Sequence, residues 1–443
     1  MKRLIETLKN IYKIDELRTR ILYTLGILLI YRLGSTIVLP GVNPNMLGAL
    51  QAKTASGVLG ILDMFSGGAF SSASVFALGI MPYISASIVI QLLGIAVPYF
   101  QRLQREGESG RRKINQLTRY LTLAILVFQA PSYLTQIPLE ARVLPGTFFI
   151  ISSMIILATG TMFVMWLGER ITDKGIGNGI SLIIMVGIIA RMPFSLFGEV
   201  TARFERGAGG PIMVIIELVF LFLVFVLTIL LVQGTRKIPV QYAKRIVGNK
   251  QYGGVRQYIP LKVNSAGVMP IIFAQAIMFL PLTFAGFSQG EEVPGWIIAM
   301  SNYTGFWYNF VFALLIVAFT YFYTAITINP QRLAEDIRKN GGFIPGIKPG
   351  KKTVEYFDNI LSKITLPGSL FLALVAILPA FAMLAGVTSG FAQFYGGTSL
   401  LILVGVIMDT LQQIESHLLM RHYDGLMKSG KVKGRIGSGV ASI

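Results

Sequence analysis

The chain has 443 residues, of which 53% are hydrophobic and 14% are charged, and its formal net charge is +18. Soluble domains carry about 25% charged residues, so this composition excludes an ordinary soluble protein and favours one that lies in a membrane. There is no Cys and there are two His, which excludes disulfides and thiolate metal sites and argues against a histidine metal centre. No metal and no other cofactor is therefore expected.

The N-terminal segment 1–20 is polar, and an apolar stripe that includes Leu4, Leu8 and Tyr12 is typical of an amphipathic helix. The apolar stretch that follows it ends at Pro40 without the small-residue cleavage pattern of a signal peptide. We therefore expect this stretch to stay in the protein as a membrane span.

Ten stretches are long and apolar enough to cross a bilayer as helices, for which about 20 residues are needed. The expected spans are 21–39, 75–97, 119–137, 147–167, 177–197, 211–233, 266–287, 307–328, 364–385 and 399–419. The fifth is the weakest of them because Arg191 and Pro193 interrupt its end. The sequence predicts an all-α polytopic membrane protein, and the even number of spans puts both termini on one side.

The distribution of charge indicates which side that is. Nearly all Lys and Arg lie in the N-terminus, the even-numbered loops and the tail, and the opposite loops carry only Lys53, Arg142, Arg191, Arg203 and Arg206. Because cytoplasmic loops hold the excess of Lys and Arg, we expect both termini in the cytoplasm, with the chain in the cytoplasmic membrane. The basic layer on that face favours binding of anionic lipids; the alternative is an acidic partner such as ribosomal RNA.

The apolar stretch 57–65 is too short to cross a membrane, and 66–73, which follows it, is rich in Gly and Ser and has low helix propensity. Non-helical backbone is tolerated at membrane depth only where protein or water satisfies its polar groups. The segment is therefore either a re-entrant half-helix that lines a cavity or an external loop with an apolar turn.

An ion-coupled solute carrier needs ionisable residues inside its spans. Arg32 lies in the first span and Asp409 near the middle of the tenth, whereas Glu217 and Glu415 lie near span ends. Asp409 is the best argument for a carrier, and the alternative for it is a structural pair with another helix. No phosphate-binding loop is found, because the glycines of 346–350 are too close together and Lys stands where Ser or Thr is needed. Energy for any work would come from a partner or a gradient.

Two long loops, 234–265 and 328–363, lie on the expected cytoplasmic side and combine basic residues with Gly and Pro. Long ordered loops on one face usually carry function, so we expect both to dock a partner. The basic residues expected to make this contact are Arg236, Lys237, Lys244, Arg245, Lys250, Lys348, Lys351 and Lys352.

Seven sets of residues, in order along the whole chain, closely resemble the bacterial SecY family, the central subunit of the Sec protein-translocation channel. They are FSGGA at 65–69, FALGIMPYISAS at 76–87, REGESGRRK at 105–113, WLGER at 166–170 with GIGNGIS at 175–181, PLKVN at 260–264, FIPGIKPG at 343–350, and GGTSLLI at 396–402. One such string would be weak support, but seven in family order are highly specific.

The resemblance implies two halves of five helices, 21–197 and 211–419, related as an inverted repeat around an hourglass pore, with 420–443 as a cytoplasmic tail. It also implies an apolar pore ring, which can gate by dewetting. The residues of this ring are Ile80, Ile84, Ile184, Ile188, Ile272 and Ile402. The first two pairs are spaced i, i+4, so each pair is expected to share one helix face, and isoleucine is stiff at χ1, which suits a narrow collar.

The resemblance further assigns 57–73 as a plug that closes the outer funnel at rest, which favours the re-entrant half-helix. Its residues are Gly60, Ile61, Leu62, Asp63, Met64, Phe65, Gly67 and Gly68. A lateral gate between the second and third helices and the seventh and eighth would be held by weak interhelical hydrogen bonds. Its polar candidates are Ser85, Ser87, Gln91, Gln129 and Gln275.

The function that the resemblance implies is a protein-conducting channel, without catalytic residues, that translocates unfolded secretory proteins and inserts membrane proteins. The implied partners are SecE-like and SecG-like small membrane subunits, a SecA-like ATPase motor, the ribosome, signal peptides and nascent chains. The chain departs from the family at Lys348, where Arg is usual and offers a bidentate fork that Lys lacks, and at the weakly basic tip 249–252. A solute carrier centred on Asp409 and Arg32, and a scaffold that only recruits membrane proteins, are the alternative functions.

Overall fold

The structure is a computed structural model that describes residues 14–54, 58–144, 146–205, 210–242, 245–247, 250–252, 256–287, 295, 299–300 and 302–428. Within these ranges the side chains of 53, 58, 61, 245–247, 250–252, 279–287 and 419–428 are not described. The start of the expected N-terminal helix, docking residue Lys244 and the end of the expected tail lie outside the described residues.

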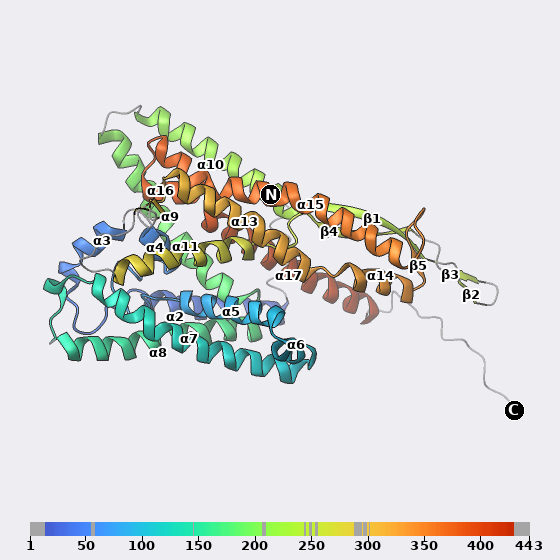
Figure 1. The fold of residues 1–443 in the computed structure, drawn as a ribbon, viewed down its shortest axis with the longest axis horizontal. Helices are drawn as coiled ribbons and strands as arrows, with labels where there is room; N and C mark the ends of the chain where they lie inside the picture. Colours follow the sequence, from blue (N-terminus) through green and yellow to red (C-terminus); the bar gives the residue numbers. More distant parts are fainter. Residues whose placement is uncertain are drawn as a thin grey trace.

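Ten helices of 16 residues or more make up most of the described chain and run alongside one another (Figure 1). They are α2 (Asp15–Gly34), α5 (Met81–Ala96), α7 (Glu108–Gln136), α8 (Gly146–Lys174), α9 (Gly179–Glu205), α10 (Gly210–Gln233), α11 (Met269–Phe287), α13 (Phe306–Thr327), α15 (Lys351–Leu384) and α17 (Gly397–Lys428). Each overlaps one expected span, which confirms the polytopic helical fold. A helix satisfies its backbone hydrogen bonds internally, as the lipid interior requires.

Six of these helices, α8, α9, α10, α13, α15 and α17, are long and apolar enough to span a membrane by themselves within the described residues. A further candidate is α5 together with α6 (Pro98–Arg105), a pair bent by 99° at a short break. The others are shorter, more polar or only partly described; α2, for example, carries Arg18, Arg20 and Arg32.

Several helices run past the expected bounds: α7 begins before 119, α15 begins before 364 and α17 continues beyond 419. Two other differences have an identifiable cause. The second was expected from 75, but α5 begins at Met81, because 66–80 forms turns in which Gly67, Gly68 and Gly79 have positive φ. Ile80 therefore precedes α5 instead of lying in it, although its carbonyl still accepts the Ile84 N–H at 3.0 Å.

The fifth span was expected to end at 197, and α9 instead continues through Pro193 to Glu205. Proline inside a helix removes one backbone hydrogen bond and usually kinks or ends it. Here the turns beyond Pro193 carry Glu199 and Arg203, whose side chains are buried and paired with each other. Tertiary contacts thus support the helix where its sequence is weakest.

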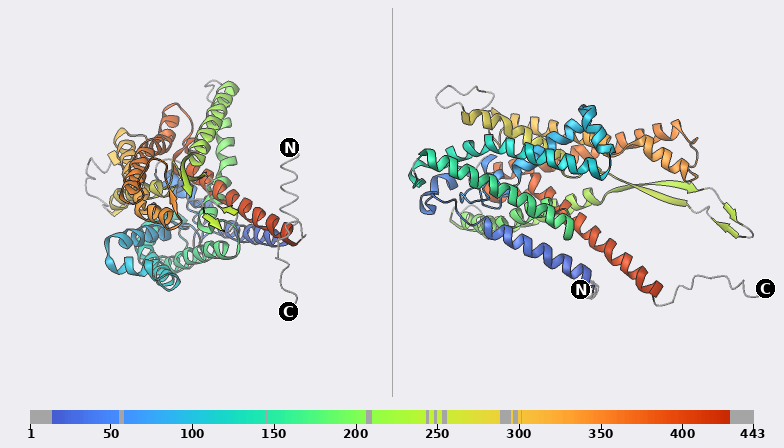
Figure 2. Two further views of the ribbon diagram at one scale, coloured as in Figure 1. Left: turned by 90° about the vertical axis from the view of Figure 1, so that its right-hand side faces the viewer. Right: turned by 90° about the horizontal axis from the view of Figure 1, so that it is seen from below.

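The loops 234–265 and 328–363 contain strands, which the sequence analysis did not predict. Strands β1 (Thr235–Tyr242) and β4 (Arg256–Lys262) pair antiparallel, with Ile238 opposite Ile259, and β5 (Gly342–Phe343) pairs with the other edge of β1. The hairpin of β2 (Arg245–Val247) and β3 (Lys250–Tyr252) continues beyond them, and the strands project from one end of the helices (Figure 2).

The two loops form one folded unit, which we call the sheet unit: β1, β4, β5, α14 (Pro330–Lys339) and the start of α15. A single apolar core joins its parts, with Val240 from β1, Ile337 from α14 and Phe357 from α15 all buried. The alternation of Ile238, Val240 and Tyr242 is the period-2 signal that could have revealed β1.

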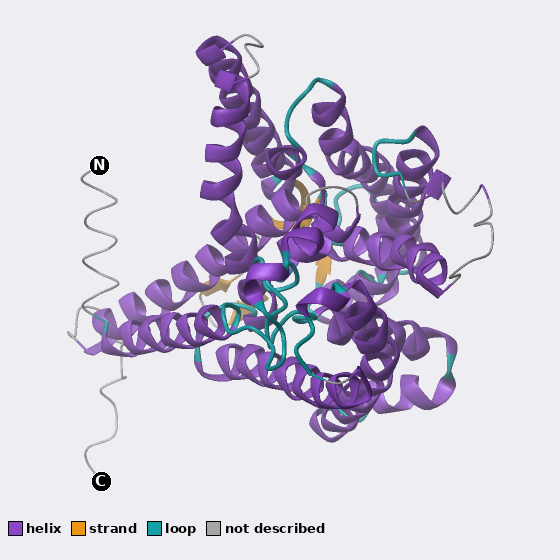
Figure 3. Ribbon diagram, turned by 90° about the vertical axis from the view of Figure 1, so that its left-hand side faces the viewer, coloured by secondary structure: helices purple, strands orange, loops and turns teal. Residues whose placement is uncertain are grey.

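Short elements complete the described chain. They are η1 (Pro44–Met46), α3 (Gly48–Thr54), α4 (Val58–Phe65), η2 (Leu139–Ala141), α16 (Ser389–Ala392) and η3 (Gln393–Tyr395). Seen from the end opposite to the strands, loops and short helices lie toward the middle of the molecule with long helices around them (Figure 3).

Candidate pore and plug

The six candidate pore isoleucines gather in one hydrophobic cluster, which we call the central cluster. Four of them, Ile80, Ile184, Ile188 and Ile402, are buried, and Ile84 and Ile272 are partly buried and pack against the same cluster. They come from α5 and the residue before it, from α9, from α11 and from α17, segments that span most of the sequence. The fold thus brings together side chains that the sequence places more than 300 residues apart.

The short helix α4 belongs to the same place. It is eight residues long and contacts α9, and its last two side chains, Met64 and Phe65, are buried within the central cluster. Other side chains of segment 58–73, among them Phe70 and Ala73, are buried in a second hydrophobic cluster with α7 and α8. The segment is thus packed among the helices and is not an external loop. The side chain of Ile61 is not described.

Segment 58–73, the candidate plug and below called the plug segment, contacts the backbone of α9 so closely that glycine is required on both sides. Gly67 has φ of +66°, and a Cβ there would lie 2.8 Å from Gly187 Cα. A Cβ on Gly187 would in turn lie 2.9 Å from the Phe65 carbonyl oxygen. Real Cβ atoms do not approach this closely, so any side chain at either position would separate the two segments.

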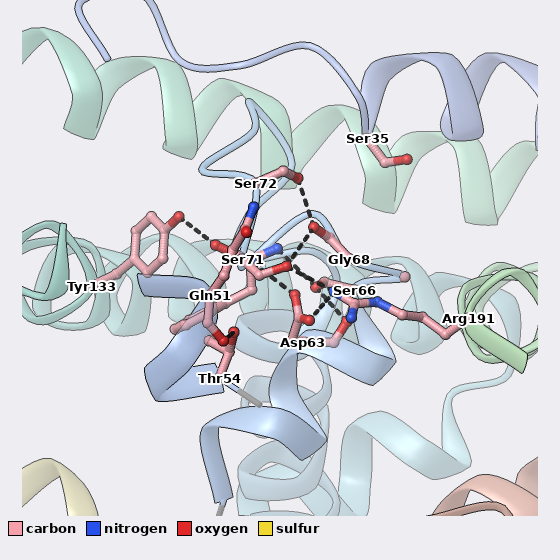
Figure 4. Close-up of polar contacts among 12 residues, drawn as sticks. Ser35, Gln51, Thr54, Asp63, Ser66, Gly68, Ser71, Ser72, Tyr133 and Arg191 are labelled. Atoms are coloured by element: carbon pink, nitrogen blue, oxygen red, sulfur yellow. Dashed lines mark hydrogen bonds and ion pairs between the residues drawn. The ribbon is translucent and has the colours of Figure 1, made fainter. Parts of the chain in front are cut away.

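A polar network holds the turn after α4 (Figure 4). The Asp63 carboxylate forms an ion pair with the Arg191 guanidinium of α9 and accepts the Ser71 N–H at 2.7 Å. Arg191 also donates to Ser71 Oγ at 2.7 Å. In the sequence Arg191 is only an interruption of a span, because no neighbouring residue shows which acid would lie opposite it.

Further contacts to this turn end on its backbone carbonyls. Arg32 Nη1 donates to Gly67 O at 2.6 Å, and Tyr31 and Tyr133 donate their hydroxyls to Ser66 O and Phe70 O at 3.3 and 2.9 Å. Arg32 is therefore engaged with the plug segment. Among the described residues it has no carboxylate partner.

Asp409, the other residue considered for an ion-coupled carrier, is exposed on α17. It forms no ion pair with the residues that the structure describes. The structural pair with another helix, which was the alternative interpretation of Asp409, is therefore not found among the described residues.

A cavity of about 450 Å³ adjoins the plug segment. The residues that line it include Arg32, Gln51, Thr54, Ser72 and Arg191, together with Phe194. Its walls are polar on the side of the plug, so it can hold water. The Arg191 side chain is 35% exposed, whereas that of Asp63 is 3% exposed.

The candidate lateral-gate residues are less clearly assembled. Ser85 donates to Met81 O and Gln91 to Ser87 Oγ, both within α5, so these bonds do not join helices as expected. Helix α7, which carries the half-buried Gln129, does contact α11. On α11, Gln275 lines a cavity of about 20 Å³ together with Met64 and Phe65, which is room for about one water.

The candidate docking residues lie on the sheet unit. Arg236 and Lys237 lie on β1 and are exposed. Lys348, just before α15, is also exposed, and so are Lys351 and Lys352 in the first turn of α15. Arg245 and Lys250 lie in the β2–β3 hairpin, where side chains are not described. Among the residues that the structure describes, no group of three or more His, Cys, Asp or Glu side chains could hold a metal ion.

A second buried charge cluster lies at the opposite end from the sheet unit. Arg203 donates to Glu199 at 2.9 Å and to Glu217 of α10 at 2.5 Å. Glu199 Oε2 also accepts the Thr388 N–H at 2.8 Å, together with the Thr388 hydroxyl. The sequence showed Glu217 near a span end, but it could not show that Arg203 would reach it.

Comparison with known proteins agrees with this geometry. The family model for SecY matches residues 74–411. A protein translocase subunit SecY of Thermotoga maritima is 42% identical over 97% of the chain and 99% of the relative, and one of Halalkalibacterium halodurans is 44% identical over 95% and 99%.

Solved structures of similar fold cover 95% of both chains. One is of a SecY protein whose plug domain is described as stabilising the closed state of the translocation channel and maintaining a membrane seal, with a TM-score of 0.63 at 17% identity. Another is Sec61 in the canine ribosome-channel complex, with a TM-score of 0.58 at 17% identity. The chain therefore belongs to the SecY family and is a multi-pass channel subunit of the protein translocase, not an enzyme.

Proposed function

We propose that the isoleucines of the central cluster form the constriction through which an unfolded polypeptide crosses the membrane. The observation that carries this proposal is that six isoleucines from four separate segments meet in the central cluster, four of them buried and two packed against it, together with Met64 and Phe65 of α4. An apolar constriction excludes water and ions when it is narrow. Because isoleucine is stiff at χ1, the collar widens by displacement of α5, α9, α11 and α17.

The plug in this proposal is segment 57–73, which covers the constriction at rest and leaves when a chain enters. The N-terminal half comprises α2 to α9 and the C-terminal half α10 to α17, and the two halves part to open the pore. Apolar segments of a client leave sideways where α7 meets α11. Polar residues there, among them Gln129 and Gln275, would release easily, since interhelical hydrogen bonds in membranes are worth about 0.6 kcal/mol.

The sheet unit is the proposed cytoplasmic docking surface for a SecA-like motor and for the ribosome, which supply the energy. Its exposed cations suit phosphate groups of ribosomal RNA, and lysine contacts phosphate without the bidentate fork of arginine. The ends of α2 and α17 that lead to the termini lie toward the end from which the strands project (Figure 2), which supports cytoplasmic termini. SecE-like and SecG-like subunits and anionic lipids would cover the exposed apolar helix faces and basic margins.

Cysteine cross-linking tests the constriction directly, because the natural chain has no Cys. We expect an arrested secretory chain to cross-link to Cys placed at Ile80, Ile184 or Ile402. Matched controls are Cys at Ile155 of α8 and Ile216 of α10, whose side chains are 63% and 55% exposed. Adducts confined to the two control positions would refute the pore assignment.

Removal of residues 60–70 is expected to make the resting channel leak ions, because α4 and its turn would no longer cover the isoleucines. The measurement is ion conductance across a bilayer that contains the resting translocase. Removal of the β2–β3 hairpin, which lies far from the central cluster, is the control and should leave this conductance at the wild-type level. An ion-tight channel without residues 60–70 would contradict the plug.

A further inference from the structure

We propose that the ion pair between Asp63 and Arg191 is a latch that holds the plug closed, with Arg191 as its positioning residue. This inference rests on the proposed function of segment 57–73 as a plug, and it assigns the group that decides whether the plug stays in place. Asp63 is the single charged residue in the stretch 58–80. Its partner lies 128 residues further along the chain, on α9.

The geometry makes Asp63 the centre of the plug's polar contacts. Its carboxylate accepts from α9 through Arg191 and from its own turn through the Ser71 N–H, and Arg191 completes a triangle by donating to Ser71 Oγ. One guanidinium therefore holds α4 and the turn 66–73 together against α9 (Figure 4). Its bonds to Asp63 and to Ser71 Oγ both leave the same nitrogen of Arg191, Nη2.

The two partners differ in their access to water, and this difference predicts how the latch fails. The Asp63 side chain is 3% exposed, whereas that of Arg191 is 35% exposed and borders the cavity of about 450 Å³. Without Asp63, Arg191 can still be hydrated from that cavity. Without Arg191, Asp63 is a buried carboxylate that lacks a cation, a state that proteins avoid.

Movement of the plug relieves the unpaired Asp63 carboxylate at the lowest cost in free energy. Segment 58–73 is short, and displacing it brings the Asp63 carboxylate into water without unfolding a long helix. The contacts from Arg32, Tyr31 and Tyr133 end on neutral carbonyls, so they add to the closed state without making it depend on charge. Loss of Arg191 should therefore open the channel more than loss of the Asp63 charge.

The experiment measures the ion conductance of the full-length chain with its partner subunits in a planar bilayer, without motor or client. For Arg191→Gln we expect about a tenfold rise in the open fraction, less than removal of a fully buried partner would produce because Arg191 is partly solvated. Asp63→Asn alone should produce a smaller rise. Adding Asp63→Asn to Arg191→Gln should lower the leak again, because the unpaired buried charge is removed.

The control is Arg142→Gln, since Arg142 donates to Leu134 O and Ile137 O and does not contact the plug. Thermal stability of each purified variant is measured in parallel. If Arg191→Gln simply damaged the fold, it would lower this stability, and adding Asp63→Asn would not restore it. Suppose that the Arg191→Gln channel conducts no more than the Arg142→Gln channel while the channel without residues 60–70 does leak. That result would refute the proposed latch and leave the proposed plug intact. If removal of 60–70 also fails to leak, the proposed function of the segment itself is wrong.

Discussion

Replacement of Arg203 by alanine is expected to lower the free energy of unfolding by about 3–5 kcal/mol, the effect of removing one partner from a buried ion pair. The Arg203 side chain is 9% exposed, and its two acceptors, Glu199 and Glu217, are 1% and 5% exposed. The substitution leaves two buried carboxylates without their cation. The cluster also joins α9, α10 and the segment before α16 through Thr388, so the two halves would lose a common anchor.

Thermal or denaturant unfolding of the purified protein in detergent measures this loss. The matched control is Arg112→Ala, which removes a pair with Glu108 at 3.7 Å whose side chains are 82% and 89% exposed. Exposed pairs of this kind contribute little to stability because water and salt screen them. Equal stability of the Arg203→Ala and Arg112→Ala variants would show that the buried cluster does not stabilise the fold.

Replacement of Gly187 by valine is expected to raise the resting ion conductance toward that of the channel without residues 60–70. The new Cβ would lie 2.9 Å from Phe65 O and 3.2 Å from Gly67 N, both backbone atoms that cannot turn aside. The plug segment must therefore move away from α9. This expectation involves no change of charge, so it tests the fit of the plug independently of its ion pair.

Gly198 provides the matched control, because it lies on the same helix and a Cβ there has no heavy atom within 4 Å. Valine at either position changes helix propensity in the same way, so a difference between the two variants isolates the contact with the plug. The readout is conductance of the resting translocase in a bilayer. A Gly187→Val channel as tight as Gly198→Val would mean that the plug tolerates displacement from α9 without opening the pore.

The number and order of the membrane spans could be predicted from local sequence alone. A span needs about 20 apolar residues whatever surrounds it, so each is visible in its own stretch of chain. The bounds were less certain: residues 75–80 are apolar but form turns, because Gly79 adopts a positive φ just before Met81. The pore isoleucines were singled out only by family resemblance, since isoleucine in a spanning helix is ordinary.

The strands of the sheet unit were not predicted, because charged and turn-forming residues dominate these loops and the alternation of Ile238 and Val240 is short. Local alternation also does not show that β1 would pair with β5, about 100 residues later, or share a core with Phe357. Burial of one face of a strand depends on what packs against it. Only the folded unit settles that these loops are one body.

Membrane location, the number of crossings and the family resemblance could all be predicted from the amino-acid sequence, because hydrophobic length and short motifs are local properties. The partners of the buried charges are visible only in the folded protein. Arg191 reads locally as a defect in a span, and Asp63 as one acid in an apolar segment, yet they meet across 128 residues. A buried charge is stable only beside its counter-charge, and which residue supplies that counter-charge is decided by how the helices pack.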